Sequence, residues 1–270
     1  MPRASYTSKK FWIAQLNRAM TVLLQSLTIL KKSQKMTLAV DLQNELQSLA
    51  NPAQAKVLQR FFKTDLGQYG EGDVFLGIKV PIQRQIAKKY SQLNFQEITT
   101  LLGSKIHEYR LIALFILIGQ YDTGDDETQA KIYKLYIKNR KNINNWDLVD
   151  LSAPNIVGKY LLNRDRQILY KLALSNHLWS KRIAVLATFE FIKNGQSQDI
   201  FALSKILLKD KHDLIHKAVG WMLREVGKRI GEKEEEKFLQ KYSSKMPRTM
   251  LRYAIERFRV EKRVFYLKKK

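Results

Sequence analysis

The chain has 270 residues, of which 45% are hydrophobic and 10% aromatic, so it can bury one large core or two small ones and is not a disordered basic tail. The absence of cysteine excludes disulfide scaffolds, thiolate zinc sites, iron–sulfur clusters and cysteine nucleophiles, and the low counts of glycine (12) and proline (5) argue against β-sandwich and linker-rich architectures. The formal net charge of +23 favours a polyanionic partner, with nucleic acid as the first expectation and an anionic membrane as the second.

The positive charge extends along the whole chain. The first acidic residue is Asp41, and seven basic residues precede it. Residues 41–270 still carry a net charge of +16, so we expect the folded body itself to be basic. We divide the chain into a basic N-terminal extension, helical or disordered, over residues 1–36, a repeat domain over 37–260 and a basic C-terminal tail over 261–270.

The N-terminal extension includes a fairly apolar stretch, Phe11–Leu30. Gln15 and Arg18 are among the residues that make it too polar for a membrane span, and no secretory cleavage pattern follows it. A transit peptide or surface-binding helix is one interpretation. The others are an additional N-terminal helix, or an upstream start codon with Met36 as the true start.

Helical periodicity dominates from residue 37 onward, and no long run alternates with period two, so the sequence predicts an all-α fold. Proline and glycine mark the breaks between helices, as at Pro52, Pro81 and Gly195. The predicted helices span 37–50, 52–63, 81–90, 94–103, 107–121, 126–140, 145–162, 165–175, 178–193, 198–208, 212–229, 232–243 and 248–259.

Similar strings recur along the chain, each with an alanine between a polar turn and an apolar run. The aligned alanines are Ala113, Ala184, Ala218 and Ala254, with separations of 71, 34 and 36 residues. The separation of 71 residues corresponds to two repeats of about 35 residues, and the missing step, a repeat without an aligned alanine, falls near residue 149. This period with two helices per unit indicates a HEAT-like solenoid, because the TPR signature is absent. We expect the solenoid to curve and to present a concave basic face.

Two other patterns have ordinary explanations. His212 and His216 are four residues apart, as are two histidine ligands of zinc on one helix. The sequence offers no third ligand with them, so we expect no metal site. The glycine-rich segment Gly67–Asp73 lacks the Lys-Ser/Thr of a phosphate-binding loop and is interpreted as an interhelix loop.

Trp146 and Asp150 are four residues apart and therefore share one helix face. A carboxylate repels phosphate, so its place beside a basic groove suggests a specific role. The alternative is that Asp150 caps the turn before Pro154 and that Trp146 belongs to the core. Arg182 and Trp221 lie on helices of the same type, where each taken alone is an ordinary groove cation or core aromatic.

The chain resembles the AlkD-type DNA glycosylases, HEAT-like repeat proteins of the bacterial DNA alkylation repair group. The resemblance runs from about Leu38 to Phe258. Four segments in the expected order carry it: Phe75-Leu-Gly-Ile-Lys-Val-Pro81, Asn145-Trp-Asp-Leu-Val-Asp150, Leu178-Trp-Ser-Lys-Arg-Ile-Ala184 and Ile215-His-Lys-Ala-Val-Gly-Trp-Met-Leu-Arg-Glu225.

The resemblance implies excision of positively charged N3- and N7-alkylpurines from duplex DNA without flipping the lesion into a pocket, unlike most glycosylases. It assigns the catalytic carboxylate to Asp150 and the active-site tryptophans to Trp146 and Trp221. A cationic purine leaves without a general acid, so the carboxylate would stabilise the oxocarbenium-like sugar. The expected DNA-binding residues are Arg182, Phe61, Lys181 and Arg252.

No metal or cofactor is expected. The expected partner is double-stranded, alkylated DNA, bound by a monomer in the bacterial cytoplasm at the nucleoid. Two features depart from the AlkD pattern: Phe61 stands where a tyrosine is usual, and the loop over residues 65–73 is longer. Both motivate the alternative of a non-catalytic binder of branched or damaged DNA. A protein-binding scaffold is a third possibility, which the charge of the repeat body argues against.

Overall fold

The computed structural model describes the backbone of residues 6–268 and the side-chain surroundings of residues 16–26 and 38–268. Within this part of the chain every regular element is a helix, and the only pairing of extended backbone is a parallel bridge between Val74 and Ile106. The predicted all-α fold is therefore confirmed. None of the described helices combines the length and the apolar character needed to cross a membrane.

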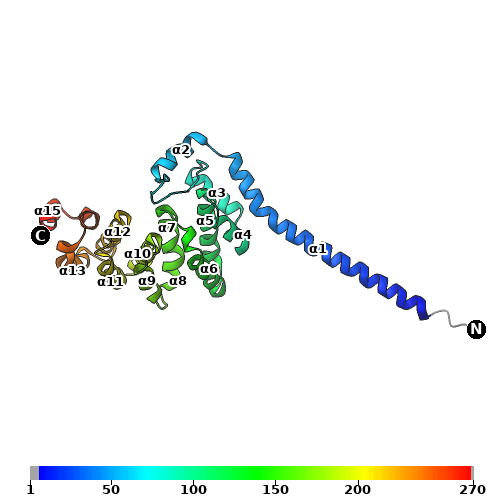
Figure 1. Ribbon diagram of the computed structural model, residues 1–270. Coiled ribbons are helices and arrows are strands. Elements are labelled where there is room, and N and C mark those ends of the chain that lie inside the picture. The colour runs from blue at the N-terminus through cyan, green and yellow to red at the C-terminus, as the bar shows by residue number, and fades with distance from the viewer. Residues whose placement is uncertain (1–5, 269–270) are drawn as a thin grey trace, which may run out of the picture. The chain divides into compact units, whose positions relative to one another are not determined.

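The chain divides into two units, Met1–Leu49 and Ala50–Lys270. The first unit consists mainly of one helix, α1 (Tyr6–Ser48), drawn in blue in Figure 1. The helix continues without a break through the boundary that we predicted after residue 36. Residues 16–26 are exposed, whereas Leu42 and Leu46 are fully buried.

The second unit follows the predicted helices closely, with ends that shift by a few residues. Helix 178–193 agrees at both ends. Local caps explain several of the starts: the Asn51 side chain accepts from the Gln54 N–H, and Asn94 forms a capping box with Glu97. The helices are α2 (Pro52–Phe61), α3 (Val80–Lys89), α4 (Phe95–Leu102), α5 (His107–Thr123), α6 (Asp126–Lys138), α7 (Trp146–Ala153), α8 (Lys159–Leu161), α9 (Gln167–Ala173), α10 (Leu178–Lys193), α11 (Gln198–Leu207), α12 (Asp213–Arg229), α13 (Glu232–Tyr242), α14 (Arg248–Ala254) and α15 (Val260–Lys268).

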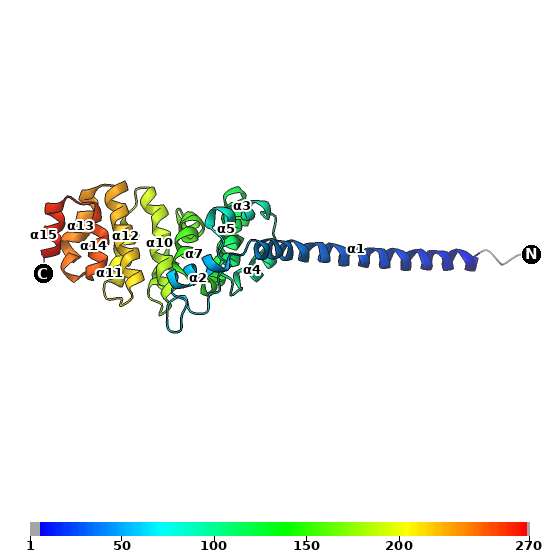
Figure 2. The same ribbon diagram turned by 90° about the horizontal axis from the view of Figure 1, so that it is seen from above.

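The repeat seen in the sequence is a row of helices in which α5, α7, α10, α12 and α14 pack in succession. Figure 2 shows the last four side by side. The four aligned alanines lie on helices of this row, and each is fully buried, as is Val149 at the missing step. The alanine position is therefore where neighbouring helices approach each other, and a larger side chain would hold them apart. The curvature and the basic face remain predictions.

The predicted helix 145–162 forms as α7, a π-helical turn over Pro154–Gly158, and α8. Pro154 has no N–H, and its ring would collide with the carbonyl of Asp150 in a regular α-helix. A wider π turn accommodates the proline without ending the helix. The distortion thus begins next to Asp150, the candidate catalytic residue.

The C-terminal residues differ from the expectation of a basic tail. Val260–Lys268 form helix α15, and Tyr266 is buried with 1% of its surface exposed. The Tyr266 hydroxyl donates to Glu236 over 3.0 Å, and Lys262 pairs with Glu232 and Glu236. One aromatic ring and a few ion pairs therefore hold this segment on α13.

The close approach of α12 and α14 makes Gly220 a sensitive position. A Cβ atom there would lie 2.5 Å from the Cβ of Tyr253, so we expect Gly220→Ala to lower the free energy of unfolding by roughly 1–3 kcal/mol through overpacking. Gly119 is a matched control within helix α5, because a Cβ there meets nothing within 4 Å. Gly119→Ala should stabilise by up to about 1 kcal/mol through helix propensity. Urea unfolding of both variants measures the contrast, and equal stabilities would contradict the packing.

Candidate functional site

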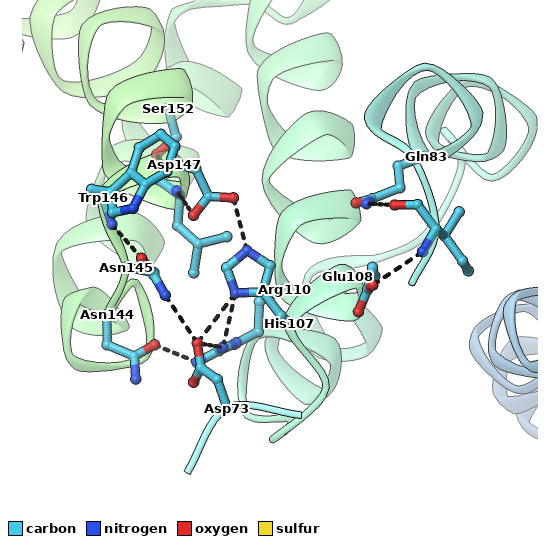
Figure 3. Close-up of polar contacts among 12 residues, drawn as sticks. Asp73, Gln83, His107, Glu108, Arg110, Asn144, Asn145, Trp146, Asp147 and Ser152 are labelled. Atoms are coloured by element: carbon cyan, nitrogen blue, oxygen red, sulfur yellow. Dashed lines mark hydrogen bonds and ion pairs between the residues drawn. The ribbon is translucent and has the colours of Figure 1, made fainter. Parts of the chain in front are cut away.

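A buried polar network fixes the start of α7, the helix that carries Trp146 and Asp150 (Figure 3). Its centre is His107, the first residue of α5, which is 2% exposed. The imidazole Nε2 lies 2.8 Å from Asp147 and Nδ1 lies 3.2 Å from Asp73. Arg110 pairs with Asp73 over 2.7 Å. The network thus joins α5, α7 and the end of the loop over residues 65–73.

Both ring nitrogens of His107 face carboxylates, which favours the doubly protonated imidazolium. Burial alone would lower the pKa of His107, but the charges and hydrogen bonds of Asp147 and Asp73 outweigh burial and raise it to about 8. The nearby Arg110 opposes them only in part. The pKa of Asp73 is in turn lowered: burial raises it, and the bonds to His107 and Arg110 outweigh burial.

A second buried carboxylate, Glu108, binds the segment Phe75–Pro81. Its oxygens accept from the backbone N–H groups of Leu76, Gly77 and Ile78 over 2.9–3.3 Å. Gly77 has φ of 84°, and a Cβ there would lie 2.7 Å from the Ala55 nitrogen, so only glycine suits this position. This segment is therefore a backbone nest for an anion and connects α2 to α5.

Asp150 forms a bidentate ion pair with Arg182 of α10. Arg182 Nε and Nη2 each lie 2.7 Å from a different carboxylate oxygen, and Nη1 donates to the carbonyl of Leu214 over 2.6 Å. The side chains of Asp150 and Arg182 are 15% and 6% exposed. Asp150 therefore binds an arginine across the helix row, in contrast to the alternative of a turn cap.

The ionisation of Asp150 reflects two opposing influences. Burial raises the pKa of this carboxyl above the ordinary aspartate value, and the charge and hydrogen bonds of Arg182 lower it without cancelling the effect of burial. Asp147 adds a smaller upward contribution because it is a second negative charge. A desolvated carboxylate held by one arginine is typical of a functional site as well as of a structural ion pair.

Trp146 is half-buried in an aromatic cluster at the start of α7. Its ring stacks on Phe62 at 5.1 Å and meets the edge of Phe61 at 5.9 Å, and the Phe62 ring stacks in turn on Phe75. Phe61 is 61% exposed, unusual for so large an apolar side chain. Phe61 and Trp146 thus present aromatic surface one helical turn from Asp150.

Trp221 lies further along the same row of helices. Its ring lies 6.4 Å from that of Phe189, and its indole N–H donates to Glu225 over 3.3 Å. Arg182 touches α12 at Leu214, seven residues before Trp221. Seven residues of helix rise about 10 Å, so the backbone of Trp221 lies about two turns beyond that of Leu214 on α12. Four of the predicted residues are linked by contacts or share a helix face: Trp146, Asp150, Arg182 and Phe61.

The predicted DNA-binding cations differ in their surroundings. Lys181 pairs with Asp210 over 2.6 Å, and Arg182 pairs with Asp150. Arg252 lies exposed on α14. The positive charge next to Asp150 is therefore largely compensated by carboxylates.

The remaining sequence candidates have structural roles. His212 caps α12 by accepting from the Leu214 N–H, and His216 bonds to the carbonyl of Asp210. Sequence analysis did not single out His107 or Tyr69 of the 65–73 loop, although both contact the site. Charged residues at the start of an otherwise apolar helix, as in His107-Glu-Tyr-Arg110, are the signal that could have identified the buried network.

The buried imidazolium makes stability depend on pH. Because the folded pKa of His107 lies above its ordinary value of 6.5, its contribution is complete below pH 6.5 and is lost as the pH rises through about 8. The loss is on the order of 2 kcal/mol. Glu235, whose pKa burial raises to about 9, also destabilises the fold with rising pH, so the comparison must isolate His107.

Unfolding of the wild type and His107→Gln between pH 6 and 9 provides this comparison. The variant should be less stable at pH 6, and the difference should shrink by pH 9 because the wild type has then lost its charged imidazole. A difference that stays constant with pH would show that the folded pKa of His107 is not raised.

Comparisons with known proteins place the chain in a family. The model of the DNA alkylation repair enzyme family matches residues 42–258. Among curated proteins none matches. A solved structure with the description "Predicted DNA alkylation repair enzyme from Enterococcus faecalis" has a TM-score of 0.62 at 16% identity, over 78% of this chain and 97% of that chain, which shows a shared fold. Since the matched region spans most of the chain and includes α7, α10 and α12, the protein belongs to the DNA alkylation repair enzyme family.

Proposed function

We propose that the protein is a DNA glycosylase that excises positively charged N3- and N7-alkylpurines from duplex DNA without flipping the base. Family membership supports a role in DNA repair. The observation that carries the finer proposal is the partly exposed Asp150, held by Arg182 one helical turn from the aromatic surface of Trp146.

The chemistry needs a negative charge more than it needs a proton donor. An N3- or N7-alkylated purine is already cationic, so it leaves as a neutral base when the glycosidic bond breaks. Positive charge then develops on the deoxyribose, and a fixed carboxylate stabilises it. Each oxygen of Asp150 has about two acceptor directions, and Arg182 uses one on each oxygen. The others can face the sugar and the attacking water.

Arg182 acts in this proposal first on Asp150. Its guanidinium is occupied by the carboxylate and by the Leu214 carbonyl, so it holds the carboxylate in one orientation and favours its ionised form. A contact between Arg182 and a DNA phosphate would require one of these bonds to open. Arg252, exposed on α14, is then the first candidate for a backbone contact, and Lys181 could make one only by leaving Asp210.

The aromatic residues would face the nucleotide. Trp146 offers a π-face that attracts a cationic base or sugar, and the exposed ring of Phe61 extends this surface. Trp221, two turns further along α12, would contact an adjoining part of the DNA. The aromatic surface of Trp146 and Phe61 can make these contacts without a hydroxyl group at position 61.

Release of free base from duplex DNA containing 7-methylguanine tests the proposal directly. We expect release above the spontaneous rate at fixed salt. Binding without release would instead favour the non-catalytic binder of branched or damaged DNA, and a higher affinity for junctions than for plain duplex would support that alternative.

Asp150→Asn should slow single-turnover excision roughly 100-fold, because the neutral amide no longer stabilises the developing cation. Binding of the same duplex should be unchanged or tighter, since a negative charge leaves the site. Asp126→Asn, which makes the same charge change at a side chain that is 92% exposed, is the matched control. Excision by Asp150→Asn at the rate of this control would exclude Asp150 as the catalytic carboxylate.

The pH dependence of kcat/KM for excision should report the Asp150–Arg182 pair of the free protein, before a cationic base lies beside it. Because burial raises the pKa of Asp150, kcat/KM should increase with pH through a midpoint above the ordinary aspartate value. Arg182→Gln removes the cation that lowers this pKa, so the midpoint should move to higher pH. Lys181→Gln removes a neighbouring cation that pairs with Asp210 instead and should leave the midpoint in place. Identical midpoints in the wild type and Arg182→Gln would contradict the coupling.

A further inference from the structure

The loop over residues 65–73 is tied to the site through its second half. Asp73 is anchored in the His107 network, and the Gly70 N–H donates to the carbonyl of Lys63 over 3.1 Å. A Cβ on Gly70 would lie 2.5 Å from the carbonyl oxygen of Phe62, so the loop backbone passes directly over the end of α2. Tyr69 therefore directly precedes a segment, Gly70–Asp73, whose backbone is fixed over the end of α2 and in the His107 network.

Tyr69, next to Gly70, extends from this loop toward two helices. Its ring meets the edge of Trp179, at the start of α10, with centroids 6.0 Å apart. Its hydroxyl lies 3.5 Å from the carbonyl of Phe61. The charges of Asp147, Lys217 and Arg182 all act on the phenol, and the two cations are themselves paired with carboxylates. Tyr69 thus stands between the end of α2 and the start of α10.

The hydroxyl proton of Tyr69 has a poor partner. The acceptor of that proton is the Phe61 carbonyl, at the outer limit of a hydrogen bond. A half-buried donor with a weak acceptor is suited to an anionic oxygen.

We propose that Tyr69 is a DNA-contacting residue whose hydroxyl donates a hydrogen bond to a phosphate oxygen of the strand that lies over Trp146. Its ring packing on Trp179 fixes the hydroxyl. The loop thereby supplies a hydroxyl next to Phe61, which has none. This inference rests on the proposed function in taking duplex DNA as the ligand of the site.

Tyr69→Phe tests the contact, because it removes the hydroxyl and keeps the ring on Trp179. Tyr160→Phe on α8, whose ring stacks on Tyr133, is the matched control. The dissociation constant of each protein for duplexes with and without 7-methylguanine is measured at one salt concentration. We expect Tyr69→Phe to bind both duplexes roughly tenfold more weakly and Tyr160→Phe to bind as the wild type does.

Neutral methylphosphonate substitutions, placed one at a time at the phosphates around the lesion, locate the partner. At the contacted phosphate the wild type should lose affinity, whereas Tyr69→Phe should lose little more, so that the two proteins converge. If Tyr69→Phe binds every duplex as tightly as the wild type, Tyr69 only holds the loop in place and the proposal is overturned.

Base release separates this inference from the proposed function. A wild type that releases no base but shows the Tyr69 and methylphosphonate effects would refute the glycosylase and support the phosphate contact. If the wild type releases base and Tyr69→Phe matches it in both binding and release, the glycosylase is supported and the phosphate contact is refuted. Loss of all DNA binding in the wild type would overturn both.

Discussion

The bridge of His107 between Asp73 and Asp147 is the interaction on which the site depends. It connects the end of the 65–73 loop to the first turn of α7 through a buried cation, so the positions of Tyr69 and Trp146 are linked. Three charged groups and Arg110 share a space from which water is largely excluded, where an unpaired charge would be costly. The network therefore holds together three segments that are separated by 34 and 40 residues along the chain. Apolar packing alone would allow these segments to shift against one another.

Charge compensation is the second organising feature. The chain carries a net charge of +23, yet two of the predicted DNA-binding cations are bound to carboxylates: Arg182 to Asp150 and Lys181 to Asp210. Ion pairs of this kind keep two helices of the row in register, and they leave the surplus positive charge on other parts of the surface. That surplus is sufficient for the long-range attraction of a polyanion. At the site itself, neighbouring cations must not cancel the negative charge of the carboxylate.

The helices and their repeat could be predicted from the sequence because apolar periodicity and buried alanines express the packing of one helix on the next. Ala184 and Ala218 show this, since each is small where its neighbour is close. The His107 network could not be predicted, because its members are about 35–40 residues apart and only the fold brings them together. Helix α15 was missed for a different reason: its short, charged sequence is fixed by one buried ring, Tyr266, and such a signal is too weak to distinguish a helix from a tail.

The site residues also divide into features that the sequence predicts and features that only the fold creates. Spacing along one helix predicted that Trp146 and Asp150 share a face, but spacing could not show that Arg182 would bind the carboxylate and also reach the Leu214 carbonyl of α12. Both outcomes depend on how α10 and α12 are offset along their axes. Tyr69 was hidden for a related reason, because the glycine-rich segment around it has no periodicity that indicates where its side chains lie.

The raised pKa of Asp150 gives the proposed reaction a source of selectivity. Burial favours the neutral carboxylic acid, and Arg182 only partly restores the charge. A cationic lesion about 5 Å away would interact with the carboxylate by about 3 kcal/mol at an effective dielectric constant near 20, which is equivalent to about two pKa units. A neutral base provides no such interaction. The carboxylate would therefore be most fully ionised when a positively charged base lies beside it, so the group that stabilises the transition state is itself strengthened by the substrate on which it acts.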